Sequence, residues 1–254
     1  MTDELFSLRD RVAVVTGGEG QLGAQIVRGL EERGARVAVF DLKSERFRVD
    51  VTDRGALEDA VDQVVREWGT PHVLVNAAAL DSPPDAPAEE VGPVESYPEA
   101  SFDEVMSVNV KGTFLPCQVV GARMAAEGRG SIVNMSSVYG MLSPVQDVYE
   151  FRRRAGDDFY KPVAYSVSKS ALYNLTRYLA TYWAKSGVRV NTLTLAGVAN
   201  EQPSEFVEAY TARMPVGRMA DVREVVGPVV FLASDASSYV TGANLVVDGG
   251  WSAW

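Results

Sequence analysis

The sequence has very few of the residues on which metal centres, disulfides and histidine-dependent catalysis rely. Its 254 residues include one cysteine, Cys117, and one histidine, His72. A single cysteine excludes an intramolecular disulfide and a cysteine-rich metal site. A single histidine argues against a zinc site and a Ser-His-Asp triad, because both use histidine as ligand or base. We therefore expect no bound metal, and the near absence of cysteine fits the reducing cytoplasm.

Long apolar runs and an excess of positive charge are also missing. No stretch of roughly 18 apolar residues occurs, so we expect no membrane-spanning helix. The first residues, Met1–Glu4, are acidic and do not follow the basic-then-apolar order of a signal peptide. The formal net charge of −10 argues against a nucleic-acid partner, which needs a basic face. We expect a cytoplasmic protein that binds a small molecule, without nucleic acid or membrane partners.

Short apolar, β-branched runs alternate with longer amphipathic stretches along the whole chain. Continuous apolar strands between helices predict a parallel sheet covered on both faces. The fold class is therefore α/β, a Rossmann-type doubly wound sheet, in one domain over residues 1–254 because no linker divides the chain. The predicted strands are Arg11–Thr16, Arg36–Phe40, Val73–Asn76, Ser131–Met135, Val188–Leu193 and Leu245–Val247.

Two segments, near residues 81–99 and 144–163, interrupt this alternation. Ser82–Pro98 holds five prolines and several acidic residues, so we expect a long loop without helix or strand. Pro144–Pro162 is polar, contains three consecutive arginines and lies between a strand and a helix. Loops of this length in a compact domain are usually functional or mobile. We treat both segments as insertions beside the core.

A glycine-rich turn follows the first predicted strand and opens the first predicted helix. In Thr16–Gly23 (TGGEGQLG), Gly18, Gly20 and Gly23 fit the G-x-G-x-x-G pattern in this context. Such glycines let the backbone approach a pyrophosphate, and the helix N-terminus offers free N–H groups. Asp41 ends the next strand, where a carboxylate accepts ribose hydroxyls and repels a 2′-phosphate, which favours NAD over NADP. The alternative is a glycine-rich turn beside a solvated aspartate.

Tyr165 and Lys169 have the spacing that places two side chains on one face of a helix. We expect this helix over Ala164–Ser186, ending at Gly187. A nearby ammonium favours a phenolate, so Lys169 would lower the tyrosine pKa and let Tyr165 exchange a proton with a substrate hydroxyl. Ser137 follows a predicted strand and offers a hydroxyl to the same substrate oxygen. The alternatives are two surface residues on an amphipathic helix and a serine-rich turn.

Taken together, these pieces resemble the short-chain dehydrogenase/reductase family along nearly the whole chain. The matching pieces occur in the order of the family: Thr16-Gly17…Gly23, Asp41, Asp50-Val51, Asn76-Ala77-Ala78, Asn109 within VNVKGTF, Ser136-Ser137, Tyr165–Lys169, Val190-Asn191 and Asp248-Gly249-Gly250. Each piece is weak alone, but the set is specific. The resemblance implies an NAD(H)-dependent oxidoreductase that interconverts a secondary alcohol and a ketone.

The resemblance also implies roles for individual residues. A catalytic tetrad would consist of Asn109, Ser137, Tyr165 and Lys169. Ser137 would hold the substrate oxygen, Tyr165 would transfer the proton, Lys169 would bind the nicotinamide ribose, and Asn109 would hold a proton-relay water. Asp50 and Val51 would frame the adenine. The implied cofactor-binding residues are Gly17, Gly18, Gly20, Gln21, Leu22, Gly23, Asp41, Leu42, Asp50, Val51, Asn76, Ala77, Ala78, Tyr165, Lys169 and Val198.

The chain departs from the family pattern at several positions around the expected site. Gln21 stands where the family usually has glycine, and Asp41 and Asp50 are too close to hold the helix usual between the second and third strands of the family. Pro144–Pro162 increases the separation of Ser137 and Tyr165. Further departures are Ala77-Ala78-Ala79 for Asn-Ala-Gly, Leu195-Ala196 for Pro-Gly and Asn200 for threonine.

The substrate is expected to be a sugar, a sugar acid or a polyol derivative. Both ends of Pro144–Pro162 must emerge beside the reacting carbon, and this segment carries candidate substrate-binding residues: Tyr149, Arg152 and Tyr160, together with Ser137. Arginine suits bidentate recognition of a carboxylate. Alternatively, Arg152–Arg154 are solvated charges that balance neighbouring acids. The runner-up substrate is a 3-oxoacyl thioester, as in the acyl-carrier reductases of the family, which usually prefer NADP.

Two other functional classes fit the sequence less well. A non-catalytic NAD-binding regulator would not need Ser137 and Asn109, and a nucleotide-sugar epimerase or dehydratase belongs to a longer related family.

Asn244–Trp254 ends with Trp251 and Trp254, and exposed aromatic ends are rarely left in water. We therefore expect a homo-oligomer, a tetramer by resemblance, unless the tail packs on the core of its own chain.

Overall fold

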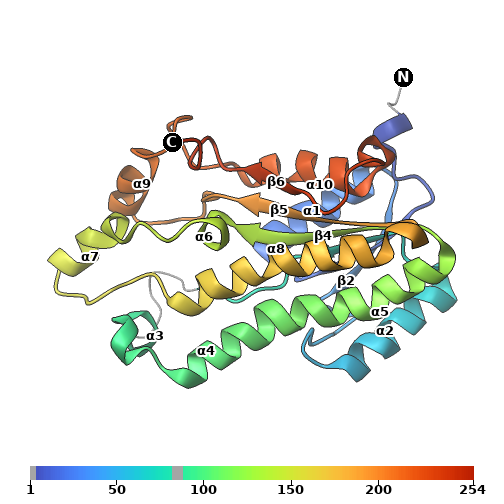
Figure 1. The fold of residues 1–254 in the computed structure, drawn as a ribbon, viewed down its shortest axis with the longest axis horizontal. Helices are drawn as coiled ribbons and strands as arrows, with labels where there is room; N and C mark the ends of the chain where they lie inside the picture. Colours follow the sequence, from blue (N-terminus) through green and yellow to red (C-terminus); the bar gives the residue numbers. More distant parts are fainter. Residues whose placement is uncertain (1–3, 82–87) are drawn as a thin grey trace.

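The computed structural model describes residues 4–81 and 88–254 and has one parallel sheet at its centre (Figure 1). Its six strands pair in the order β2-β1-β3-β4-β5-β6, and all five strand pairs are parallel. The predicted doubly wound α/β fold is therefore confirmed. The strands are β1 (Val12–Thr16), β2 (Arg36–Phe40), β3 (Val73–Asn76), β4 (Gly130–Ser137), β5 (Val188–Leu195) and β6 (Asn244–Val247).

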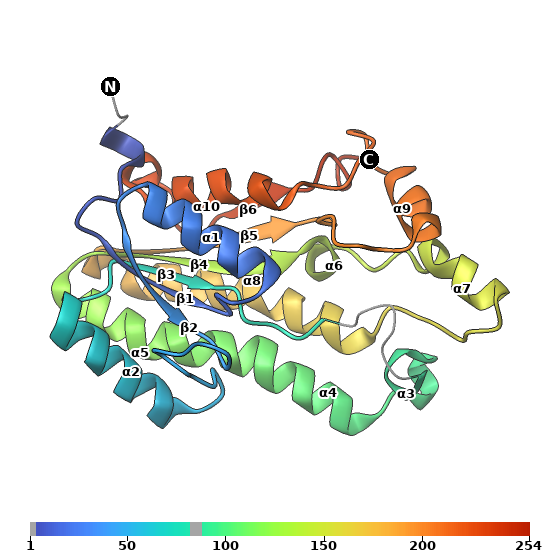
Figure 2. The ribbon, with the colours of Figure 1, turned by 180° about the vertical axis from the view of Figure 1, so that it is seen from behind.

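The helices cover both faces of the sheet, as Figures 1 and 2 show from opposite sides. Apolar residues of α1 and α10 pack on one face, and those of α2, α5 and α8 pack on the other. The helices are α1 (Gln21–Glu32), α2 (Arg54–Trp68), α3 (Ala88–Val91), α4 (Glu99–Met106), α5 (Gly112–Glu127), α6 (Val138–Met141), α7 (Glu150–Arg154), α8 (Val163–Trp183), α9 (Ser204–Thr211) and α10 (Val226–Ala233).

The strand register explains why one edge of the sheet can hold a site. The central strands β1 and β3 are buried over their whole length, as their uninterrupted apolar sequences require. Thr16, the last residue of β1, pairs with Phe40 at the end of β2 and with Asn76 at the end of β3. Ser137, at the end of β4, pairs with Leu195 at the end of β5. The loops that carry the predicted site residues therefore leave the sheet at one common edge.

The two insertions are more ordered than expected. Gln146–Tyr149 forms a 3-10 helix that leads into α7, and Val94–Ser96 forms another 3-10 helix after α3. The prediction of a loop without helix over Ser82–Pro98 was therefore wrong for residues 88–96, while residues 82–87 lie outside the described residues. Pro93 is the N-cap of the 3-10 helix Val94–Ser96 and Pro98 is the N-cap of α4, positions where a missing N–H costs little.

An aromatic cluster explains this order. Tyr149 packs against Phe159 and Phe206, whose ring centroids are 4.8 and 5.5 Å away. Figure 1 shows the elements involved, with α3, α7 and α9 gathered at the end of the molecule away from the N-terminus. Periodicity along the sequence did not reveal this cluster, because its members come from separate segments.

Two other expectations concern short stretches of chain. No helix lies between Asp41 and Asp50, as expected, and a single parallel bridge joins Asp41 and Arg48 there. In the C-terminal tail, Trp251 is buried and stacks on Tyr210 with ring centroids 4.3 Å apart. Trp254 is 83% exposed. Of the two tryptophans in the tail, Trp251 is therefore packed on the core and only Trp254 is exposed to solvent.

Candidate active site

The glycine-rich turn forms a cradle in which side chains would not fit. Gly17 has φ +66°, and a Cβ there would lie 2.7 Å from the backbone of Ala78. A Cβ on Gly23 would lie 2.0 Å from the carbonyl oxygen of Gly17. Helix α1 begins at Gln21, and Gly20 before it gives no side-chain cap, so the first N–H groups stay available to an anion. The backbone here fits the pyrophosphate of a dinucleotide.

Asp41 lies beside this turn. One carboxylate oxygen accepts a hydrogen bond from the Glu19 N–H at 3.1 Å, and the other accepts one from the Lys43 N–H at 2.9 Å. Each oxygen keeps further lone pairs for ribose hydroxyls. Leu42, which follows, is exposed at the same edge. The structure therefore brings Asp41 and the phosphate cradle together.

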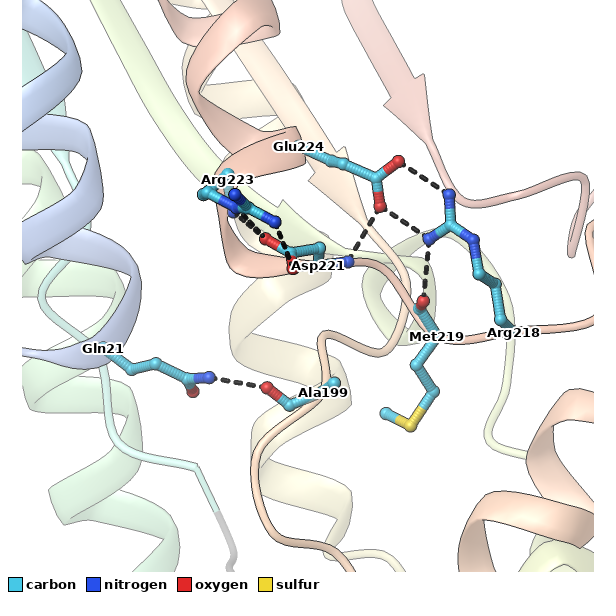
Figure 3. A network of polar contacts seen from close by, with 7 residues as sticks. All are labelled: Gln21, Ala199, Arg218, Met219, Asp221, Arg223 and Glu224. Carbon is cyan, nitrogen blue, oxygen red and sulfur yellow. Dashed lines mark hydrogen bonds and ion pairs between the residues drawn. The ribbon is translucent and has the colours of Figure 1, made fainter.

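Gln21, the departure from the family glycine, makes a contact that glycine could not make. Its Nε2 donates to the carbonyl oxygen of Ala199 at 2.8 Å, and so joins the start of α1 to the loop after β5 (Figure 3). Val198, next to Ala199, forms a parallel bridge with Ala220. Leu22 faces partly inward and packs with the apolar cluster under α1. The Val198 loop is thus held by Gln21 of α1 at one residue and by Ala220 at the next.

The loop after β3 also reaches the cradle. The Thr16 hydroxyl accepts hydrogen bonds from the N–H groups of Ala77 and Ala78, both at 3.2 Å. The Asn76 side chain, in contrast, points into the core, where its Nδ2 donates to Asn134 Oδ1 at 2.9 Å and lies 3.2 Å from the Cys117 sulfur. Any contact of Asn76 with a cofactor would therefore use its backbone.

Asp50 and Val51 lie in the connection between β2 and α2. Both the N–H and the hydroxyl of Thr52 donate to Asp50 Oδ1, at 2.8 and 2.7 Å. Val51 is buried, and a Cβ on Gly112 would lie 2.6 Å from it. Because only glycine fits there, Val51 packs tightly against the first turn of α5.

Ser137 and Tyr165 meet where β4 ends and α8 begins. The Ser137 hydroxyl is near enough to lower the pKa of the Tyr165 phenol, and it accepts the N–H of Tyr139 at 3.2 Å. The Tyr173 hydroxyl donates to the Ser137 carbonyl at 3.0 Å and fixes the backbone at this point. The long insertion between Ser137 and Tyr165 therefore does not separate them in space.

Lys169 lies one helical turn from Tyr165 and is buried. Its Nζ donates to the carbonyl oxygen of Met135 at 3.1 Å and lies 5.8 Å from the centroid of the Tyr165 ring. Burial lowers the pKa of Lys169 to about 8. Burial first and the charge of Asp81 second raise the pKa of Tyr165, while the hydrogen bond from Ser137 acts in the opposite direction. In the protein alone, burial and Asp81 therefore keep the Tyr165 pKa high, and the lowering by Lys169 stays a prediction.

Asn109 lies in a π-helical turn, Ser107–Lys111, between α4 and α5. Its amide binds the backbone of Leu80 in both directions: Nδ2 donates to the Leu80 carbonyl at 3.0 Å, and Oδ1 accepts the Leu80 N–H at 2.7 Å. Nδ2 also donates to the Ser168 hydroxyl at 2.9 Å. Asn109 therefore fixes the loop after β3 against α8, next to Tyr165.

The proposed substrate residues of the insertion already contact other residues of the insertion or, for Tyr160, a residue of α3. Arg152 forms an ion pair with Asp157, and its guanidinium carbon lies 4.1 Å from the ring centroid of Phe159. Tyr149 is buried in the aromatic cluster. Tyr160 is partly exposed and donates its N–H to the Val91 carbonyl at 2.6 Å. These contacts stabilise the insertion.

Sequence reasoning missed two charged residues that lie on the same tyrosine. The Lys161 ammonium lies 4.6 Å from the Tyr165 ring centroid and 2.6 Å from an oxygen of Asp81. The available signal was the spacing, since Lys161 precedes Tyr165 by the same four residues that separate Tyr165 from Lys169. Lys161 and Asp81 lie at the borders of the two insertions, and no periodic pattern in the sequence links them.

Comparisons with known proteins agree with this geometry. The family model described as enoyl-(acyl carrier protein) reductase matches residues 19–252. The chain belongs to the short-chain dehydrogenase/reductase family. It is an oxidoreductase of this family that acts on CH–OH groups and uses a nicotinamide cofactor.

Individual relatives match over nearly their whole length. The chain is 34% identical to D-threitol dehydrogenase of Mycolicibacterium smegmatis, over 97% of this chain and 95% of that protein. It is 30% identical to NAD-dependent glycerol dehydrogenase of Listeria innocua, over 98% and 97%. A crystal structure of gluconate 5-dehydrogenase from Burkholderia cenocepacia, in complex with NADP and tartrate, superposes with a TM-score of 0.85 at 27% identity, over 99% and 98%.

Over residues 4–81 and 88–254, no group of three or more histidine, cysteine, aspartate or glutamate side chains is arranged to hold a metal ion. None of the helices in the same ranges has both the length and the apolar character needed to cross a bilayer.

Proposed function

We propose that the protein is an NAD(H)-dependent dehydrogenase that interconverts a secondary alcohol and a ketone on a sugar, a sugar acid or a polyol. The observation that carries the proposal is the junction of Ser137, Tyr165 and Lys169 beside a phosphate cradle that ends at Asp41. The relatives named for threitol, glycerol and gluconate act on small polyhydroxyl compounds, which supports the same substrate class.

The residues have separate tasks in this proposal. Ser137 donates to the substrate oxygen, and Tyr165 takes the hydroxyl proton in oxidation or returns it in reduction. Lys169, with a pKa near 8, binds the nicotinamide ribose and passes protons between Tyr165 and solvent. Asn109 fixes the loop after β3 and holds a relay water. The bound nicotinamide accepts or supplies the hydride and, when oxidised, adds positive charge that favours the phenolate.

The cradle residues support NAD over NADP. Asp41 is the carboxylate beside the N–H groups of the turn, where it would accept ribose hydroxyls and repel a 2′-phosphate. Gly17, Gly18, Gly20 and Gly23 would face the pyrophosphate, with Asp50 and Val51 beside the adenine. Val198 and the Ala77-Ala78 backbone would contact the nicotinamide half.

One screen of NADH formation tests this proposal. Sugars, sugar acids, polyols, 3-hydroxyacyl thioesters and steroid alcohols are offered with NAD, and we expect turnover among the first three groups. The thioesters are included because the description of the matching family model names an acyl-carrier substrate. Activity confined to thioesters and steroids would contradict a polar substrate, and no turnover with any alcohol would favour a non-catalytic NAD-binding protein.

We further propose that the protein is a cytoplasmic homo-oligomer, a tetramer. Three exposed aromatic side chains support an interface: Trp254 at the C-terminus, and Tyr178 and Tyr182, which stack on each other on α8. Trp254→Ser and the double variant Tyr178→Ser/Tyr182→Ser each leave the packed Trp251 in place. Light scattering should show a smaller assembly for at least one of them. An unchanged mass for both would contradict this interface.

A further inference from the structure

An ion pair that the proposed reaction does not use lies directly on the catalytic tyrosine. Lys161 Nζ is 2.6 Å from Asp81 Oδ1 and 4.6 Å from the centroid of the Tyr165 ring. The two partners differ in exposure: the Lys161 side chain is 7% exposed and that of Asp81 is 62% exposed. The Lys161 ammonium is therefore buried beside the Tyr165 ring, whereas the Asp81 carboxylate is exposed to solvent.

Both partners are held by backbone contacts from different parts of the chain. The Lys161 N–H donates to Gln146 Oε1 at 2.9 Å, and Gln146 Nε2 donates back to the Lys161 carbonyl at 3.4 Å. Asp81 follows Leu80, whose N–H and carbonyl are both bound by Asn109. The pair therefore joins the insertion to the loop after β3 beside the ring of Tyr165.

The three arginines of the insertion, Arg152–Arg154, already form ion pairs with acidic neighbours. Arg152 pairs with Asp157, and Arg153 pairs with Glu150 and donates to two backbone carbonyls, those of Gln146 and Phe159. Lys169 is buried and its ammonium already donates to the Met135 carbonyl, and with a pKa near 8 it loses its charge as the pH rises through 8. A substrate carboxylate would therefore not find a spare positive charge in these groups.

Asp81, in contrast, acts on the reacting groups. Its negative charge raises the pKa of Tyr165 and also that of Lys169, second in each case to the effect of burial. Close charges of like sign repel in a partly buried site more strongly than in water. An anionic substrate bound at Tyr165 would meet this repulsion, whereas a neutral one would not.

We propose that Lys161 and Asp81 form a substrate-binding pair that selects neutral polyhydroxyl compounds over sugar acids. The ammonium donates to one hydroxyl oxygen of the substrate, and the carboxylate accepts from a neighbouring hydroxyl, so a vicinal diol satisfies both. The inference rests on the proposed dehydrogenase activity and narrows its substrate class.

The first test changes the exposed partner. Asp81→Asn keeps the shape of the side chain, removes its charge and releases the Lys161 ammonium. We expect the ratio of kcat/KM for sugar acids to kcat/KM for neutral polyols to rise about five- to tenfold, a moderate effect because Asp81 is mostly exposed. A ratio that stays within twofold of the wild-type ratio, or that moves toward polyols, would overturn the proposed selection.

The second test changes the buried partner. Lys161→Met has a similar length without the ammonium, and we expect KM for neutral polyols to rise about tenfold with a smaller change in kcat. The increase in Tm that a polyol gives the enzyme with NAD should shrink in parallel, which measures binding without turnover. Lys185→Met, on an exposed lysine beyond the end of α8, is the matched control and should leave both readouts unchanged.

The outcomes separate the two proposals. A wild-type enzyme that oxidises no polyol, sugar or sugar acid would contradict the proposed function, and the selecting pair would fall with it. A wild-type enzyme that oxidises these compounds but prefers the acids would keep the proposed function and reject the selecting pair. A Lys161→Met enzyme that loses kcat and keeps both KM and the polyol-induced shift in Tm would also reject the pair, because Lys161 would then not bind substrate.

Discussion

The two edges of the sheet hold similar kinds of side chain but use them differently. At the carboxyl edge, Tyr165 and Lys169 are packed side by side with perturbed pKa values beside a glycine cradle. At the amino edge, His72 precedes β3 and also has a perturbed pKa, but its Nδ1 accepts the N–H of Val12, the first residue of β1. In a parallel sheet, the carboxyl edge is where ligands bind. Position in the sheet therefore separates a candidate catalytic group from a structural one better than the shifted pKa does.

The largest effect is expected at the carboxyl edge. Tyr165→Phe removes the phenol that we propose exchanges the substrate proton, so turnover should fall by about 10²–10⁴-fold. NADH affinity should stay within a few-fold, because the cofactor is held mainly by the cradle, whereas Lys169→Ala should reduce both. Steady-state rates and NADH fluorescence titration measure the two effects. Retention of more than a tenth of the rate would assign the proton transfer to another group.

A smaller effect is expected at the end of β2. Asp41 should make wild-type affinity for NADH at least about tenfold higher than for NADPH, which corresponds to about 1.4 kcal/mol. Asp41→Ser should reduce this preference, because it removes the repulsion of a 2′-phosphate and one acceptor for the ribose. Fluorescence titration with both cofactors gives the ratio directly. Tighter binding of NADPH than NADH by the wild type would contradict the role of Asp41.

A still smaller effect is expected from the contact between α1 and the loop after β5. Gln21→Ala removes one hydrogen bond to the Ala199 carbonyl, a contact worth about 1 kcal/mol. NADH should then dissociate about fivefold faster in stopped-flow fluorescence, because the Val198 loop loses its tie to the cradle. Gln202→Ala, which also removes a bond to this loop but away from the cradle, is the comparison. Equal rates in wild type and Gln21→Ala would leave the contact without a role in cofactor retention.

The smallest effect is expected at the amino edge. Burial first, then the charges of Arg129 and Arg11, lower the pKa of His72 to about 4 from an ordinary value of 6.5. Between pH 6.5 and 4 the unfolded chain therefore binds more protons than the folded one, and stability falls as the pH falls through this window. His72→Gln should make the fall shallower, by about 1 kcal/mol near pH 5 after allowance for solvent screening, without changing kcat. Urea unfolding measures the difference.

The same histidine gives a direct spectroscopic check. Because His72 is the only histidine in the chain, its ring protons titrate in the NMR spectrum without overlap from another imidazole. We expect a midpoint near pH 4. A midpoint at pH 6.5 would show that the ring is solvated. His72 would then no longer be an example of a shifted pKa at the amino edge of the sheet.

The fold, and the meeting of the glycine turn with Asp41, could be predicted from the sequence because their signals are local. A continuous apolar strand, a glycine turn and Asp41 lie within one stretch of chain, and strand pairing then brings them together. The spacing of Tyr165 and Lys169 is likewise a property of one helix. These features need no knowledge of which distant segments touch.

The substrate side was less readable because its contacts are formed between distant segments. Arg152 has the chemistry of a carboxylate ligand, and only the structure shows it bound to Asp157 and packed on Phe159. Lys161 and Asp81 are 80 positions apart in the chain, and no periodic pattern links them. The order of the proline-rich segment also depends on distant contacts, such as the hydrogen bond from Tyr160 to Val91.

The amide of Asn109 behaves toward Leu80 as a peptide group of an adjacent strand would. It supplies one donor and one acceptor to the same residue, and so continues sheet-like pairing where the sheet itself has ended. Aspartate would replace the donor with a second acceptor and place it against the Leu80 carbonyl, and serine is too short to meet both groups. The direction in which the chain leaves β3, and with it the position of Asp81 beside Lys161, therefore depends on a carboxamide at residue 109.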